Sequence, residues 1–189
     1  MSLDVAGLSE VATVTRRNEK DELLARGREL GLIVWEGRAT VEKFHGDEAF
    51  EAHRGAKPYE VTETEPNLLL TAGAGLIWSL LTGGAGTALN SSNAYIAVGD
   101  STTAAAAGQT DLQAASNKVR QLVSGAPSLS TNQAVFAATF GTGAANFAWQ
   151  EWGVANASTG GVLLNRVVSS LGTKTSSASW TLTATLSLA

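Results

Sequence analysis

The sequence predicts a mainly β protein: an antiparallel sandwich or jelly-roll-like domain with one short helix, preceded by an extended N-terminal arm that contains a helix of its own. Short apolar segments recur after residue 92 and are separated by turns rich in glycine, serine, threonine and asparagine. This spacing is typical of antiparallel folds. The charged residues, in contrast, are concentrated in the first 66 positions.

The last apolar segment is the clearest strand. From Ser179 to Leu188, serine and threonine alternate with apolar residues. The alternation places one set on a single face: Trp180, Leu182, Ala184, Leu186 and Leu188. A period of two in a threonine-rich segment indicates a strand with one buried face.

The other elements follow from similar patterns. Strands are expected at about 93–99, 117–123, 132–140, 147–155, 161–170 and 177–188. A helix is expected to begin at Asn67, as its cap, and to end near Gly83 and Gly84. Trp78 is expected at the edge of this helix. Its buried stripe is predicted to be Leu69, Leu76, Ile77, Leu80 and Leu81.

Charge divides the chain into two parts. Residues 1–66 hold 14 of the 17 acidic and 9 of the 13 basic residues. We therefore separate a charged arm, 1–66, from a β-rich domain, 67–189, which has seven charged residues in 123 positions. The surface of a small monomer normally carries about a quarter or more charged residues. A surface so poor in charge predicts extensive contact with other polypeptides.

The arm is predicted to contain two elements and a connection. A helix is expected at about 16–30, ended by Gly31. A strand at about 32–44 follows, with Gly37 as a bulge or bend. Residues 45–66 are interpreted as an extended connection that lies on a partner. Deletion of residues 1–60 is therefore expected to leave a soluble trimer that no longer binds a larger particle.

The composition disfavours most catalytic and metal chemistry, and we expect no enzyme activity and no cofactor. The chain has no cysteine, which excludes disulfides and zinc–thiolate sites, and only two histidines, His45 and His53. The histidines flank Asp47, Glu48 and Glu51. We interpret this cluster as a solvated acidic loop instead of a metal site, with a weak cation contact left open.

Other site-like fragments are interpreted as turns. The sequence Gly99–Thr102 is a turn after a strand. Neither Gly83–Gly86 nor Gly141–Gly143 is followed by the lysine and hydroxyl of a phosphate loop. A formal net charge of −4 disfavours nucleic-acid binding. We also expect no targeting segment and no membrane contact.

Eight residues are candidates for protein interfaces. They are Trp35, Phe44, Trp78, Trp149, Glu151, Trp152, Arg166 and Trp180. Trp149 and Trp152 are expected on the same face of a strand, with Glu151 opposite. We favour a core or interface role for this aromatic pair over stacking on a sugar. Glu151 and Arg166 are expected to pair, within one subunit or between two.

The order of several short segments resembles virion proteins of tailed bacteriophages. The segments are Asn67–Gly73, Tyr95–Asp100, Thr110–Leu112, Ala145–Val154 and Gly161–Arg166. The resemblance covers about residues 67–189, and Val41–Ala49 is similar to the leader of such proteins. The succession of helix, strand-Gly-Asp and Glu-x-Gly is similar to the amino-terminal attachment domains of phage tail fibres.

The resemblance implies a non-enzymatic structural protein of the virion, made in the host cytoplasm, and it implies no catalytic residues. Fibre attachment domains are followed by a shaft and a tip, and this sequence contains neither up to Ala189. We therefore expect a capsid decoration (cement) protein instead, a homotrimer that clamps the major capsid protein. A tail, baseplate or fibre-attachment adaptor is the alternative. A third hypothesis is a glycan-binding module that uses Trp149 and Trp152.

Overall fold

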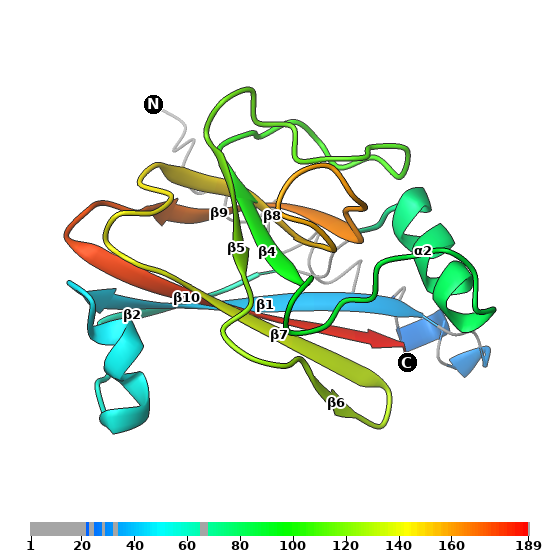
Figure 1. The fold of residues 1–189 in the computed structure, drawn as a ribbon, viewed down its shortest axis with the longest axis horizontal. Coiled ribbons are helices and arrows are strands. Elements are labelled where there is room, and N and C mark those ends of the chain that lie inside the picture. Colours follow the sequence, from blue (N-terminus) through cyan, green and yellow to red (C-terminus); the bar gives the residue numbers. More distant parts are fainter. Residues whose placement is uncertain (1–21, 23–24, 28, 32–33, 65–67, 189) are drawn as a thin grey trace, which may run out of the picture.

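The protein is a sandwich of two five-stranded antiparallel sheets (Figure 1). The computed structural model describes residues 22, 25–27, 29–31, 34–64 and 68–188. The first sheet has the order β2-β1-β10-β7-β6 and the second β3-β9-β8-β4-β5. The prediction of a mainly β sandwich with a short helix is confirmed.

The elements have the following bounds. The first sheet contains β1 (Trp35–His45), β2 (Glu60–Glu63), β6 (Ser128–Ser130), β7 (Gln133–Phe140) and β10 (Ala178–Leu188). The second contains β3 (Leu68–Leu69), β4 (Tyr95–Gly99), β5 (Lys118–Leu122), β8 (Ala148–Ala155) and β9 (Asn165–Thr173). The helices are the 3-10 helix η1 (Glu48–Arg54) and α2 (Thr71–Leu81).

Strand β1 belongs to the sandwich, although the sequence analysis assigned it to the arm. It pairs with β10 along its whole length, from Trp35 opposite Leu188 to His45 opposite Ala178. The pairing passes through Gly37 without a shift, so the predicted bulge is absent. The boundary at residues 66 and 67 therefore does not separate the arm from the folded domain. The sequence analysis assigned β1 to the arm because the strand carries several charged residues, as the rest of the arm does.

Residues 48–63 also pack on their own chain. Strand β2 pairs with β1, and the η1 residue Ala49 is buried and donates its backbone N–H to Ser179 Oγ at 3.1 Å. The predicted extended connection is thus a 3-10 helix and an edge strand. Of the helix predicted at 16–30, residues 16–21, 23–24 and 28 lie outside the described residues. The described residues 22, 25–27 and 29 are helical, and Gly31 has a φ of +70°.

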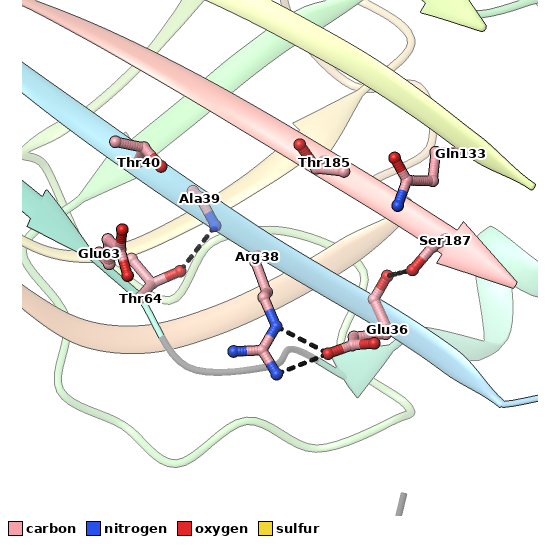
Figure 2. A pocket seen from close by; sticks show the side chains of 9 residues that line it. All are labelled: Glu36, Arg38, Ala39, Thr40, Glu63, Thr64, Gln133, Thr185 and Ser187. Carbon is pink, nitrogen blue, oxygen red and sulfur yellow. Dashed lines mark hydrogen bonds and ion pairs between the residues drawn. The ribbon is translucent and has the colours of Figure 1, made fainter. Parts of the chain in front are cut away.

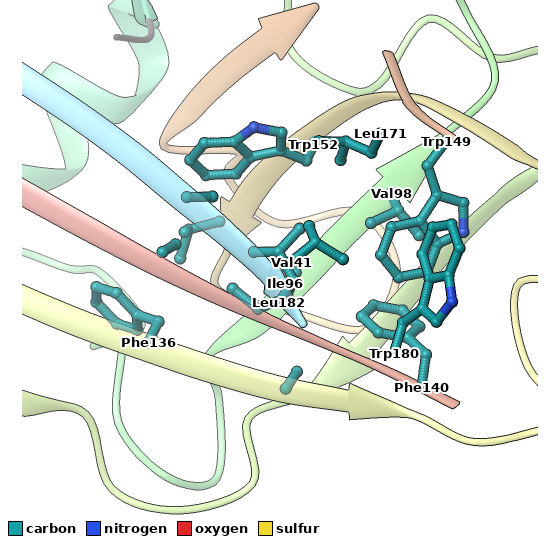
Figure 3. Close-up of a cluster of buried hydrophobic side chains, with 14 of the residues drawn as sticks. Val41, Ile96, Val98, Phe136, Phe140, Trp149, Trp152, Leu171, Trp180 and Leu182 are labelled. Atoms are coloured by element: carbon teal, nitrogen blue, oxygen red, sulfur yellow. The ribbon is translucent and has the colours of Figure 1, made fainter. Parts of the chain in front are cut away.

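The core lies between the two sheets and contains several aromatic side chains (Figure 3). The ring of Trp149 from β8 meets the edges of Phe140 and Trp180 at centroid distances of 4.7 and 4.9 Å. Edge-to-face pairs of this kind add about 0.5–1.5 kcal/mol each beyond the area that they bury. Because the three residues come from both sheets, this cluster fixes how the sheets face one another.

A β-bulge allows Trp149 and Trp152 to share this core. Residues three apart point to opposite faces in a regular strand. Here Trp149 pairs with Gly172 but Trp152 pairs with Val167, so the register of β8 against β9 shifts between Trp149 and Glu151. The two indoles therefore lie on one face, as expected, and Glu151 lies on the other. The bulge, which the sequence analysis did not predict, is the cause.

Helix α2 is shorter than predicted and less buried. It begins at Thr71 after the N-cap residue Leu70, and the predicted cap Asn67 lies outside the described residues. A Cβ on Gly73 would lie 2.1 Å from the backbone oxygen of Leu164, so only glycine permits this close approach. Of the predicted stripe, Leu76 is buried, Leu69 and Ile77 are partly buried, and Leu80 and Leu81 are exposed. The burial predicted for the last two is wrong.

Candidate functional site: a docking surface

Six of the eight interface candidates are buried within one chain. Phe44, Trp149, Glu151, Trp152, Arg166 and Trp180 are each at most 2% exposed. These side chains therefore do not form a contact surface, and Trp149 and Trp152 are not placed to stack on a sugar. Trp35 is partly buried, and Trp78 is 67% exposed. Apolar strand residues suit a core and an interface equally well, so sequence patterning did not separate the two roles.

Glu151 and Arg166 form the predicted ion pair, within one chain. Arg166 Nε donates to Glu151 Oε2 at 2.6 Å, and both side chains are fully buried. Glu151 also accepts the backbone N–H groups of Gln113 and Ala114 at 3.0 and 2.8 Å. A Cβ on Gly99 would lie 2.5 Å from Glu151 Oε1, so glycine makes room for the carboxylate.

The remaining donors of Arg166 reach the same loop. Its Nη1 donates to Gln109 Oε1 at 2.9 Å and its Nη2 to the backbone oxygen of Thr103 at 2.8 Å. Glu151 and Arg166 thus hold the segment 100–117 against the outer face of the second sheet. Leu112 from this segment is buried there with Ala97. The pair is structural, because all of its hydrogen-bonding partners belong to the segment it fixes.

A second ionic group lies at the edge of the second sheet. Asp111 accepts hydrogen bonds from Lys118 and Arg120, each at 2.8 Å. Arg120 also donates to the backbone oxygens of Ala157 and Gly160. Asp111, Lys118, Arg120 and Gly160 line a cavity of about 290 Å³. Burial opposes ionisation of Asp111, but the hydrogen bonds from Lys118, Arg120 and the Leu112 backbone hold its pKa below the usual 3.8.

This lowered pKa predicts an acid-dependent contribution to stability. A carboxyl group with a lower pKa in the folded state stabilises the protein above the unfolded pKa, and the effect is lost as the pH falls through the folded pKa. Because Asp111 is 40% exposed, we expect less than about 1 kcal/mol. Urea unfolding of wild type and Asp111→Asn, at pH 7 and at pH 3, measures it: the difference between the two proteins should shrink at the lower pH. A difference independent of pH would contradict this assignment.

The other charges after residue 67 are also satisfied within the chain. Lys174 is 1% exposed and donates to Gly141 O and Asn146 Oδ1 at 2.7 and 2.9 Å. Burial lowers the pKa of Lys174, and the charge of Asp47 opposes this shift. Asp100 accepts a hydrogen bond from Asn117 Nδ2 at 2.7 Å. All seven charged residues between 68 and 188 therefore contact partners in their own chain.

Two cavities of the described residues do not suggest a reaction. A depression of about 330 Å³ lies over β1, β2, β7 and β10 (Figure 2). Arg38 in its lining pairs with Glu36 at 2.6 Å, and threonine and serine hydroxyls supply much of the rest. Among the described residues no group of three His, Cys, Asp or Glu side chains is placed to hold a metal ion. His45 stacks on Tyr59 at a centroid distance of 4.6 Å.

Exposed apolar side chains gather on α2. Trp78 is 67% exposed, Leu81 71% and Leu80 38%. The helix carries no charged residue, and Figure 1 shows it at one end of the long axis of the molecule. Leu129 on the edge strand β6 is 82% exposed but lies on the other sheet. We call the outward side of α2, formed by Thr71, Gly75, Trp78, Leu81 and Thr82, the α2 face.

No described helix is long and apolar enough to cross a membrane. Exposed tryptophan and leucine on an uncharged helix are typical of a protein contact. The α2 face is therefore the candidate docking surface. Comparison of the chain with protein-family models, with curated proteins and with solved structures finds no match.

Proposed function

We propose that this chain is a non-enzymatic structural protein of a tailed-bacteriophage virion, and that it decorates the capsid. The proposal combines the residue resemblance with one structural observation. The seven charged residues after residue 67 are all engaged within the chain, and this part of the sandwich presents an exposed apolar helix to its surroundings. Such a surface is stabilised by contact with other polypeptides, at about 25 cal/mol for each Å² of apolar area buried, before ordering costs are subtracted.

The two parts of the chain have separate roles in this proposal. The sandwich, from Trp35 to Leu188, forms a homo-oligomer, for which the resemblance implies a trimer. The residues before β1 are the charged arm and clamp neighbouring copies of the major capsid protein. Residues 1–34 hold six acidic and five basic residues, as expected for a segment that orders on its partner instead of building a core of its own.

Particle binding tests the proposal. Purified full-length chain is incubated with particles of the encoding phage that lack it, and bound protein is measured by sedimentation of the particles. We expect binding at hundreds of copies per particle, and a chain that begins at Val34 to bind at least about tenfold more weakly, equivalent to about 1.4 kcal/mol. Saturation at a few copies would favour the tail or baseplate role. Failure of the full chain to bind would refute a virion role.

A further inference from the structure

Helix α2 is apolar on its outward as well as its inward side. Its inward side contains Gly73, which lies against the backbone of Leu164, and Leu76, which is buried. Its outward side carries Trp78 and Leu81, both largely exposed. A helix that is apolar all round is normally buried all round. The described part of the chain leaves one side of α2 uncovered.

The sizes of the side chains change along the helix. The first half, Thr71–Gly75, is made of threonine, alanine and glycine, and the second half, Leu76–Leu81, is bulky apart from Ser79. A Cβ on Gly75 would meet no atom within 4 Å, so this position is an open notch on the surface. Trp78 projects one turn further along the same face. A notch and a projection of this kind lie side by side on the α2 face.

We propose that α2 binds α2 of a second copy, antiparallel and about a two-fold axis beside Leu76 and Ile77. In a two-fold contact, residue i of one copy meets residue j of the other, and j meets i. This axis sets Trp78 of each copy over Gly75 of the other. Thr71 and Thr82 then meet at both ends. Each bulky half packs on a small half, which permits close approach of the two helices.

The charges of α2 fit the same arrangement. The helix has no acidic residue in its first turn and no basic residue in its last, so no side-chain charge offsets its dipole. An antiparallel neighbour places the negative C-terminal end of one helix beside the positive N-terminal end of the other. A two-fold contact also brings like groups together, and an uncharged face avoids their repulsion. These features favour a second copy over a charged partner or an anionic lipid surface.

This inference deepens the proposed function by naming one homotypic contact, and it is tested on free protein without particles. Because the contact is two-fold, it joins two single copies into a dimer, or two trimers into a hexamer. The mass of the assembly in sedimentation equilibrium is therefore the readout. If α2 does not pair, particle binding by the arm is unaffected, so the two proposals can be tested separately.

Three variants of the full chain test the pairing. Gly75→Trp fills the notch and sets two tryptophans against each other, whereas Trp78→Ala leaves the notch empty. Each should halve the assembly mass or raise its dissociation constant at least about tenfold. The double variant Gly75→Trp/Trp78→Ala exchanges notch and projection and should restore association. Leu129→Ala, which removes an exposed apolar side chain from β6, is the matched control and should not change the assembly mass.

Circular dichroism and Tm show whether each variant is folded. Gly75 has open space around it and an ordinary helical φ, so substitution there leaves the monomer intact. A wild-type monomer, or a mass that neither single variant changes, overturns the pairing. A double variant that stays dissociated overturns the two-fold geometry. The pairing is also overturned if the wild-type chain is a monomer that binds particles and Trp78→Ala abolishes that binding. In that case the α2 face contacts the particle.

Discussion

Replacement of Arg166 by leucine is expected to lower the free energy of unfolding by about 3–5 kcal/mol. The change leaves the Glu151 carboxylate fully buried with two backbone N–H donors and no counter-charge. It also removes the hydrogen bonds to Gln109 and Thr103 that hold the segment 100–117. Urea unfolding monitored by tryptophan fluorescence measures the loss.

A matched change at an exposed pair provides the control. Lys118→Met breaks the ion pair with Asp111, in which the two side chains are 38% and 40% exposed, and should cost no more than about 1 kcal/mol. A double-mutant cycle of Glu151→Gln and Arg166→Leu should give a coupling energy of about 1–3 kcal/mol. Equal losses for Arg166→Leu and Lys118→Met would show that burial adds nothing to the Glu151–Arg166 interaction.

Deletion of residues 1–60 is expected to abolish folding, contrary to the soluble trimer that the sequence analysis predicts. The deletion removes β1, which pairs with all of β10 and buries Ala39, Val41 and Phe44. Loss of a buried phenylalanine alone costs about 3–5 kcal/mol. Removal of the whole strand therefore exceeds the stability of about 5–15 kcal/mol that is usual for a domain.

A chain that begins at Val34 is the control for this deletion. It keeps β1 complete and should retain the far-ultraviolet circular dichroism spectrum of a β protein and a cooperative thermal transition. The chain that begins at Val61 should show neither, or should accumulate as insoluble protein. A cooperative transition in the shorter chain would mean that β10 pairs stably without β1, in disagreement with the sandwich.

Local alternation predicted the long strands of the first sheet well after residue 130. The predicted strand 177–188 corresponds to β10 (Ala178–Leu188), and 132–140 to β7 (Gln133–Phe140). The predicted strand 161–170 is displaced, because Gly160 and Gly161 adopt positive φ and β9 begins at Asn165. The short edge strands β2, β3 and β6 were not predicted, since four or fewer residues do not establish a period.

The candidate site was less predictable than the fold, because a residue belongs to a contact surface only if no other part of the chain buries its side chain. The sequence contains a single acid near Arg166 in the predicted strands, and this predicted the Glu151–Arg166 pair. It did not indicate that the segment 100–117 would bury that pair. Trp78 and Trp149 are equally apolar, yet one is 67% exposed and the other fully buried. Only the three-dimensional packing separates an interface residue from a core residue.

The pairing of β1 with β10 also constrains how the protein is made. Residues 35 and 188 are opposite each other, so nearly the whole chain separates the two partners. Contacts so distant in sequence are slow to form, because loop closure must precede the gain from pairing. During translation β1 leaves the ribosome long before β10 exists, and its apolar face waits without a neighbour. The nascent first sheet is therefore completed only after β10 has left the ribosome, and until then the apolar face of β1 requires protection by chaperones.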